Sequence, residues 1–210
     1  MCAVIGVDIQ SPTPDDIELI RNLFRESRIR GKHATGVSLL RAGTITTIIS
    51  PISADLFIEQ HDPVHWVYDN RITFIGHCRY STSDIEYNQP IADCDLSVVH
   101  NGVISQELPE NWESLYGIQC EGKNDTELLF HTLKQGKDPF EVWGESSISA
   151  IWLTSDSGMR YNRNGKRPLW AYESEDRVIV TSTKDIAKRA GLIHEPTRVE
   201  IEGRDLQPAL

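Results

Sequence analysis

The first thirty residues change from a strand-like hydrophobic run to the spacing of an amphipathic helix. Residues 3–9, AVIGVDI, are β-rich and almost wholly apolar, which predicts a buried strand. Thr13 and Pro14 then supply a capping residue and a first-turn proline, and apolar side chains follow at helical spacing. This stripe consists of Ile17, Ile20, Leu23 and Phe24. We therefore expect a helix here that packs one face on the core, with Gly31 as its stop.

Short strand-like runs dominate the rest of the chain. They lie at residues 35–41, 44–50, 71–78, 96–100, 148–154, 168–173, 177–181 and 198–202. Helical patterns lie at residues 125–134, after Pro139, and at residues 184–190. The Ala42-Gly43 step between the first two runs is a hairpin signal. Strands in close succession, with helices grouped near the start, middle and end, predict an α+β layered fold with mostly antiparallel sheets.

Length and composition favour one soluble globular domain spanning residues 1–210. With 39% hydrophobic and 25% charged residues, a chain of this size buries enough surface to fold without a disulfide or metal. The chain contains no 18-residue apolar run, and MCAVIGVDIQ lacks the features of a signal peptide. We therefore expect a cytoplasmic protein with no membrane span.

Charge and cysteine spacing restrict the possible partners further. Lys and Arg number 21 against 31 Asp and Glu, a net charge of −10, and the basic residues are scattered. Nucleic acids and anionic membranes both need clustered basic residues, so neither is expected as a partner. The four cysteines, Cys2, Cys78, Cys94 and Cys120, show no CxxC spacing. We expect them to be reduced, and we expect no metal and no cofactor.

Cys2 becomes the first residue once Met1 is removed, which aminopeptidases do when the second residue is small. The processed residue holds a thiol and a free α-amine, and an α-amine of pKa about 7.7–8.0 is a base suited to neutral pH. N-terminal-nucleophile hydrolases pair these groups, with the amine doing the work of a triad histidine. A cysteine at position 2 is more often incidental, so other segments must decide its meaning.

Two motifs follow strand-like runs and carry groups suited to a small substrate. GHCRYST, residues 76–82, places Arg79 before two hydroxyl residues, a combination that binds a carboxylate in two places and orients it. A surface ion pair is the alternative. VVHNG, residues 98–102, ends in Asn101 and Gly102, which form either a turn or an oxyanion hole from a side-chain amide and a backbone N–H.

A third motif, NDTELL at residues 124–129, begins a predicted helix. The Asp125 carboxylate there either interacts favourably with the helix dipole or accepts the α-ammonium of an amino acid. An arginine for the carboxylate and an aspartate for the ammonium together describe an amino-acid site.

In this order and spacing, the segments resemble the class II glutamine amidotransferase domain found in amidophosphoribosyltransferase and glucosamine-6-phosphate synthase. The matching segments are Cys2, RGKHATG (30–36), GHCRYST (76–82), VVHNG (98–102) and NDTELL (124–129). NGKRPLW (164–170) and VIVTST (178–183) look like that domain's closing strands, so the resemblance spans nearly the whole chain. It implies a four-layer αββα sandwich of two mostly antiparallel sheets, the N-terminal-nucleophile-hydrolase type.

The resemblance also implies the reaction and its catalytic residues. Cys2 attacks the glutamine side-chain amide and releases glutamate and ammonia, while Asn101 and Gly102 stabilise the oxyanion. Arg30 and Gly31 fall where the family places a loop packed against the nucleophile.

Substrate recognition is implied at four further positions. Arg79 and Thr82 hold the α-carboxylate, and Asp125 receives the α-ammonium. Tyr80 stands where the family has an aromatic residue in the loop that closes over glutamine.

The sequence departs from the family pattern at two positions. Ala3 replaces a common glycine, and His33 replaces a frequent acidic residue. Neither position supplies a group to the implied mechanism, so activity is still expected. His77 and His100 are expected to be core or supporting residues, since the α-amine serves as the base.

The acceptor of the ammonia is the main open question. Fused amidotransferases continue into a synthase domain, whereas this sequence ends at Leu210 and has no GxxxxGK[ST] nucleotide loop. We expect a separate synthase or acceptor subunit. The alternatives are a free-standing amidase acting on γ-glutamyl compounds and a non-catalytic glutamine-binding regulatory module. Cys2 and Asn101 favour catalysis, because a sensor needs Arg79 and Asp125 but no nucleophile.

Overall fold

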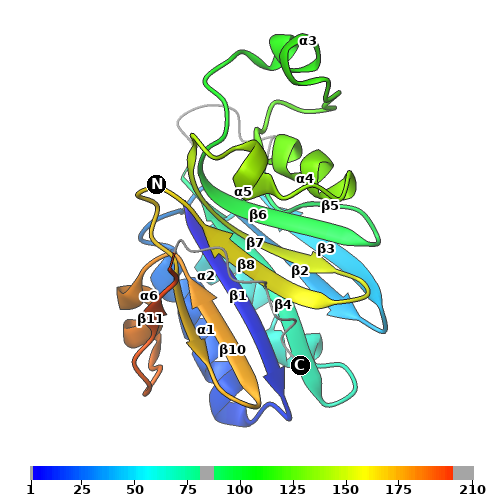
Figure 1. Ribbon diagram of the computed structural model, residues 1–210. Helices are drawn as coiled ribbons and strands as arrows, with labels where there is room; N and C mark the ends of the chain where they lie inside the picture. Colours follow the sequence, from blue (N-terminus) through cyan, green and yellow to red (C-terminus); the bar gives the residue numbers. More distant parts are fainter. Residues whose placement is uncertain (1, 81–87, 201–210) are drawn as a thin grey trace.

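The computed structural model describes residues 2–80 and 88–200, in which two antiparallel sheets lie face to face (Figure 1). The larger sheet contains β1 (Ala3–Gln10), β2 (Ala34–Arg41), β3 (Thr44–Ser50), β4 (Arg71–Arg79), β9 (Trp170–Glu173), β10 (Arg177–Thr181) and β11 (Thr197–Arg198). The smaller sheet contains β5 (Ile91–Ala92), β6 (Leu96–Val103), β7 (Ser147–Thr154) and β8 (Gly158–Arg163). Their orders are β11-β9-β10-β1-β4-β2-β3 and β5-β6-β7-β8, so β1 and β4 lie in the interior of the larger sheet.

Helices cover the two outer faces of this sandwich (Figure 1). The larger sheet is covered by α1 (Pro14–Ser27), α2 (Ala54–Gln60), η1 (Pro63–Trp66) and α6 (Lys184–Ala190), and the smaller by α4 (Thr126–Lys134) and α5 (Pro139–Val142). The segment between β6 and α4 forms two further short helices, η2 (Pro109–Asn111) and α3 (Trp112–Tyr116). These layers confirm the α+β, αββα fold class. Among the described residues, no helix is long and apolar enough to cross a membrane.

Three apolar layers hold the sandwich together. Because successive side chains of a strand point to opposite faces, β1 contributes Ile5 to the helix-facing core and Val4 to the core between the sheets. On β4, Phe74 likewise packs in the helix-facing core and Ile75 in the core between the sheets. Val99 of β6 packs in the core between the sheets from the smaller sheet. Residues at the ends of β1, β4 and β6 are therefore held by packing on both sides.

Local signals explain the elements that the pattern predicted. The Thr13 N–H donates to the Asp16 carboxylate at 2.9 Å, and the Asp16 N–H donates to the Thr13 hydroxyl at 3.3 Å, which completes a capping box for α1. The predicted hairpin forms between β2 and β3, with Ala42 and Gly43 both at positive φ. The helix ends at Ser27, with Arg28 as its cap, so the prediction of Gly31 as its stop is wrong. Gly31 packs instead against the end of β4.

Some short elements differ from the prediction. β8 and α2 had no clear periodic signal, since α2 makes only two turns and β8 is largely polar. The run at 168–173 becomes a strand only at Trp170, and the run at 198–202 contributes β11, which ends at Arg198. Within residues 2–80 and 88–200, β11 pairs only with β9, so its extent depends on tertiary pairing.

Candidate active site

The start of β1 and the end of β4 meet at one end of the larger sheet. Ala3 pairs with Cys78 in the antiparallel register, so Cys2 and Arg79 are the next residues along the two strands. Strand alternation places Cys2 on the same face as Val4, between the two sheets. Cys2 is a partly buried free thiol. The fold therefore brings the proposed nucleophile and the proposed carboxylate ligand to one end of the interior.

The loop after α1 packs against both strand ends. The Arg30 Nε donates to the Cys2 carbonyl oxygen at 3.2 Å. A Cβ atom at Gly31 would lie 2.1 Å from the Cys78 carbonyl oxygen and 2.6 Å from the Arg79 nitrogen, so only glycine allows this approach. Burial lowers the pKa of the Arg30 guanidinium, which stays charged near neutral pH. The structure thus places Arg30 beside Cys2, and Gly31 against the Cys78–Arg79 peptide of the neighbouring strand.

Arg79 and Tyr80 lie where β4 leaves the sheet. One Arg79 Nη donates to the Asn88 side-chain oxygen at 3.2 Å, and the guanidinium remains partly exposed. Tyr80 is 46% exposed, and its ring centroid lies 4.9 Å from that of His33. Thr82 lies outside the described residues, so its predicted contact with the carboxylate stays a prediction.

Asn101 and Gly102 lie near the end of β6, which packs across β1 and β4. Alternation places Asn101 on the face of Ser97, whose hydroxyl donates at 2.7 Å to the Ser38 hydroxyl of the larger sheet. The Asn101 side chain is buried, and its Nδ2 has no hydrogen-bond partner within the described residues. Because a buried donor without an acceptor costs about 1–3 kcal/mol, this amide is suited to receive one from a ligand.

The backbone at Gly102 requires glycine. Its φ is +149°, and a Cβ atom there would lie 2.6 Å from the Ser147 carbonyl oxygen of the neighbouring strand. This conformation does not belong to the two-residue turn that Asn-Gly usually indicates, because β6 continues through both residues. The alternative of a simple turn at Asn101 and Gly102 is therefore wrong.

Asp125 precedes α4 and faces the end of β6. Its carboxylate accepts the Ile104 N–H at 2.7 Å, its other oxygen lies 3.6 Å from His100 Nε2, and the side chain stays 21% exposed. It makes no hydrogen bond that caps its own helix. His100 Nδ1 lies 2.8 Å from the Thr126 hydroxyl, and burial lowers the His100 pKa, so the imidazole beside the Asp125 carboxylate is neutral.

Two supporting residues were not singled out by the sequence. The Ser182 hydroxyl accepts the Val4 N–H at 2.7 Å, and the Ser182 N–H donates to the Val4 carbonyl at 3.1 Å. This fully buried serine therefore fixes the start of β1, two residues from Cys2. Thr126 similarly links His100 to Asn124, whose side-chain oxygen accepts the Thr126 hydroxyl at 2.6 Å. The sequence could have indicated both residues through the motifs that contain them: Ser182 lies in VIVTST (178–183), and Thr126 lies in NDTELL (124–129).

His77 is buried between the sheets and lacks hydrogen-bond partners for its ring among the described residues. Burial, followed by the charges of His100 and Arg79, lowers the His77 pKa to about 3. His77 is therefore neutral at physiological pH, and within the described part of the chain neither of its ring nitrogens forms a hydrogen bond with Cys2.

His77 should make the fold sensitive to acid. The unfolded chain binds a proton at this residue near pH 6.5, whereas the folded chain does so only near pH 3, so the free energy of unfolding falls as pH decreases between these values. We expect a loss of about 3 kcal/mol between pH 7 and pH 4, measured by urea unfolding. His77→Gln should reduce this loss, whereas the exposed control His65→Gln should retain it. An unchanged loss in His77→Gln would contradict the assignment.

The four-layer sandwich has a cysteine directly before an interior strand of its larger sheet, and its layering is the αββα type that the sequence resemblance implied. Comparisons with protein-family models and with curated proteins found no match to this sequence. Comparison with solved structures, in contrast, found shared folds.

Three of these structures define the similarity. Glutamine phosphoribosylpyrophosphate amidotransferase from B. subtilis, complexed with ADP and GMP, aligns over 94% of this chain with a TM-score of 0.69 and 19% identity. The allosteric regulatory enzyme of purine biosynthesis aligns over 94% with a TM-score of 0.67 and 19% identity. This chain covers 44% of each. A glutamine aminotransferase class-II domain protein from Silicibacter pomeroyi aligns over 85% of this chain and 87% of its own, with a TM-score of 0.54 and 14% identity.

These likenesses show a shared fold. The neighbours match the amidotransferase domain that the sequence resembles, and the first two extend well beyond the region that this chain covers.

Proposed function

We propose that this chain is a class II glutamine amidotransferase domain protein that hydrolyses the glutamine side-chain amide to glutamate and ammonia. The observation that carries the proposal is the placement of three groups on strands that pack together. Cys2 precedes β1, Arg79 ends β4, and β6 supplies Asn101, a buried amide donor without an acceptor in the described part of the chain. We further propose that residues 1–210 act as one domain in the cytoplasm, where the thiols stay reduced.

In the proposed mechanism, the free α-amine of Cys2 accepts the thiol proton while Sγ attacks the amide carbon of glutamine. The tetrahedral oxyanion is stabilised by the Asn101 amide and the Gly102 N–H. The C–N bond then breaks, and ammonia leaves with the proton returned by the amine. Water adds to the resulting thioester, the C–S bond breaks, and glutamate and the free thiol are regenerated.

The substrate is proposed to bind through both of its charged ends. Arg79, together with Thr82, binds the α-carboxylate, because a guanidinium donates two parallel hydrogen bonds to a carboxylate. Asp125 accepts the α-ammonium, and its partly exposed carboxylate beside neutral His100 supports this role. Tyr80 is proposed to close over the bound glutamine from the end of β4.

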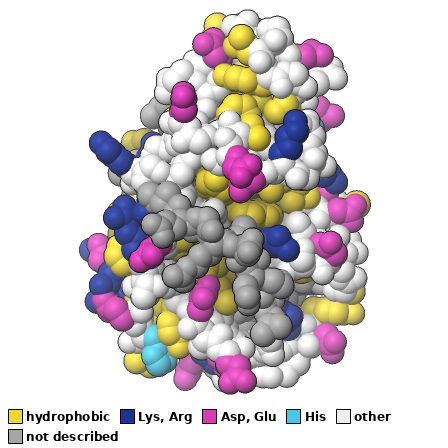
Figure 2. Space-filling model, viewed as in Figure 1, with side chains coloured by type: hydrophobic (Ala, Val, Ile, Leu, Met, Phe, Trp, Pro, Cys, Tyr) yellow, Lys and Arg dark blue, Asp and Glu magenta, His cyan; other side chains and the backbone are white. Residues whose placement is uncertain are grey.

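We propose that the ammonia passes to an acceptor on a separate protein. Figure 2 shows hydrophobic side chains gathered at the top of the molecule, over the segment that holds η2 and α3. The exposed apolar residues of this segment are Val103, Leu108, Leu115 and Tyr116. The segment leaves the site directly after Gly102 and returns at Asn124, so a partner bound there would contact the site's edge.

Turnover of glutamine by the purified chain tests the proposed function. Release of glutamate and ammonia from glutamine is measured alongside a panel of γ-glutamyl peptides, with and without co-purifying proteins. Slow glutamine hydrolysis that a partner stimulates about 5–150-fold would support ammonia transfer. Rapid turnover without a partner, with preference for a γ-glutamyl peptide, would favour the free-standing amidase. Glutamine binding without any hydrolysis would favour the regulatory module.

Substitutions of the recognition pair should reduce specificity for glutamine. Arg79→Lys loses the two-pronged carboxylate contact, and Asp125→Asn loses the charge that opposes the ammonium. Each should lower kcat/KM by about 10²-fold, or about 3 kcal/mol, as expected when a buried partner of a bound ion is removed. Steady-state kinetics on glutamine provide the measurement. Values of kcat/KM within a few-fold of the wild type for both variants would refute this binding mode.

A further inference from the structure

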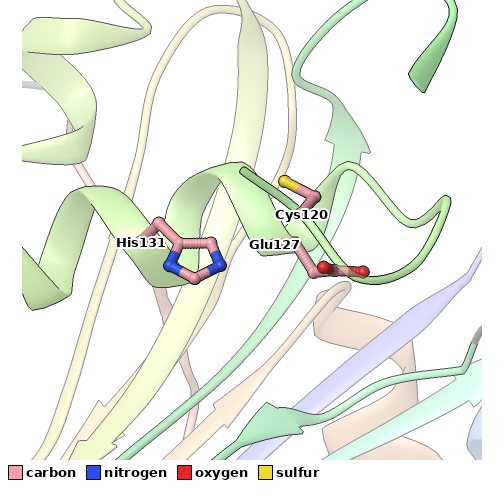
Figure 3. Close-up of side chains that lie close together, drawn as sticks. All are labelled: Cys120, Glu127 and His131. Carbon is pink, nitrogen blue, oxygen red and sulfur yellow. The ribbon is translucent and has the colours of Figure 1, made fainter. Parts of the chain in front are cut away.

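Outside the candidate active site, three side chains with metal-binding chemistry lie together beside α4 (Figure 3). Glu127 and His131 are four residues apart on this helix and so share a face, while Cys120 comes from the loop before it. One donor atom from each residue, a carboxylate oxygen, an imidazole nitrogen and the thiol sulfur, lies within 4.8 Å of the other two.

The carboxylate of this cluster is held in place by the loop. Glu127 is buried and accepts the Glu121 N–H at 2.7 Å and the Gly122 N–H at 2.9 Å. A carboxylate offers about four lone-pair sites, so these bonds orient it and leave it able to bind an ion. Cys120 and His131 are both partly exposed, which gives an ion access from solvent.

The charge of the cluster also favours a cation. The Cys120 sulfur lies within 4.8 Å of a Glu127 carboxylate oxygen, so a thiolate there would add a second negative charge to the cluster. A metal ion would replace the thiol proton and offset the adjacent negative charges.

We propose that Cys120, Glu127 and His131 bind one Zn²⁺ ion, with water as the fourth ligand. Thiolate, imidazole and carboxylate are all zinc ligands, and this mixture is softer than the all-oxygen sites of Mg²⁺ and Ca²⁺. Tetrahedral coordination requires donors about 3.3–3.6 Å apart, so the three groups, which lie within 4.8 Å of one another, need to close by at most about 1.5 Å. Rotation of the partly exposed Cys120 and His131 side chains supplies this movement. The ion would then join the loop to α4 through Cys120, which lies five residues before Asp125 in the chain.

A second group of possible ligands provides a matched control. Asp93, Cys94 and Asp95 lie together, but all three are exposed and the group has no imidazole. Asp93 is already engaged by the Lys134 ammonium at 2.5 Å and by the N–H groups of the following turn. Cys94→Ser therefore removes a thiol beside acidic residues without disturbing the proposed site.

Titration of the full chain with Zn²⁺, followed by calorimetry, tests the proposal, and Co²⁺ serves as a spectroscopic probe. We expect one tightly bound Zn²⁺ per chain, and visible Co²⁺ bands typical of tetrahedral coordination with a thiolate. Cys120→Ser and His131→Ala should each weaken Zn²⁺ binding by at least about 100-fold. Cys94→Ser and Cys2→Ser should bind as the wild type does. Circular dichroism establishes that each variant is folded.

Thermal unfolding gives a readout that is independent of glutamine turnover. Free Zn²⁺ at about 100 times its Kd should raise the wild-type Tm by about 5–10 °C, and Cys120→Ser should lose this shift. Absence of stoichiometric binding by the folded wild type would overturn the proposal. Equal binding by Cys120→Ser and His131→Ala, or loss of binding in Cys94→Ser or Cys2→Ser, would place the ion elsewhere and also overturn it.

Discussion

Replacing Cys2 with serine should lower glutamine turnover by several orders of magnitude while the fold remains intact. The change exchanges one sulfur atom for oxygen, and Cys2 lies before the first cross-strand pair of β1, so no sheet pairing is lost. A serine hydroxyl is much harder to convert to a nucleophilic anion at neutral pH than a cysteine thiol. The measurement is kcat for glutamate and ammonia release, with circular dichroism to establish folding.

Chemical labelling and intact mass provide the controls for this prediction. A glutamine-mimicking electrophile should label Cys2 and spare the other three cysteines. Burial raises the pKa of the Cys78 and Cys120 thiols, and the neighbouring Asp95 raises that of Cys94, so all three are poor thiolates. The active protein should also lack Met1, because the mechanism needs a free amine on Cys2. Full activity in protein that wholly retains Met1 would contradict the mechanism.

Replacing Asn101 with alanine should lower kcat by about 10²–10³-fold and change KM little. The Asn101 amide is proposed to donate to an oxyanion that exists only in the transition state, and loss of one such donor costs about 2.7–4 kcal/mol. Substrate binding is proposed to rely instead on Arg79 and Asp125. Steady-state kinetics separate the two parameters, and a rise in KM alone would show that the oxyanion role is wrong.

Ser149→Ala is the matched control for Asn101→Ala. Ser149 is the cross-strand partner of Asn101 on β7 and is also fully buried, with a hydroxyl that has no hydrogen-bond partner within the described residues. No catalytic role is proposed for it. Its kcat should stay within about twofold of the wild type, whereas a loss as large as that of Asn101→Ala would indicate disturbed packing between the sheets.

The two catalytic variants also separate catalysis from sensing. An enzyme should lose turnover in Cys2→Ser and still bind glutamine, because Arg79 and Asp125 are unchanged. A regulatory module should show the same glutamine-dependent behaviour in the wild type and in both variants, since neither Cys2 nor Asn101 would take part in binding.

The sequence by itself determined the elements whose signals are local. The apolar run of β1 and the capping box of Thr13 and Asp16 involve neighbours in the chain, and the hairpin of β2 and β3 depends on a two-residue turn. The order of five short motifs also carried the resemblance to a known family, and that resemblance implied the four-layer fold class and a set of candidate residues.

Only the tertiary structure decided how these groups meet. Neither the pairing of Ala3 with Cys78 nor the packing of Gly31 on the Cys78–Arg79 peptide leaves a periodic signal, because each joins segments distant in the chain. Likewise, the sequence showed no zinc spacing, and Cys120 meets Glu127 and His131 only because the loop folds back on α4. Local side-chain preferences specify the elements, whereas burial and strand pairing between distant segments specify the site.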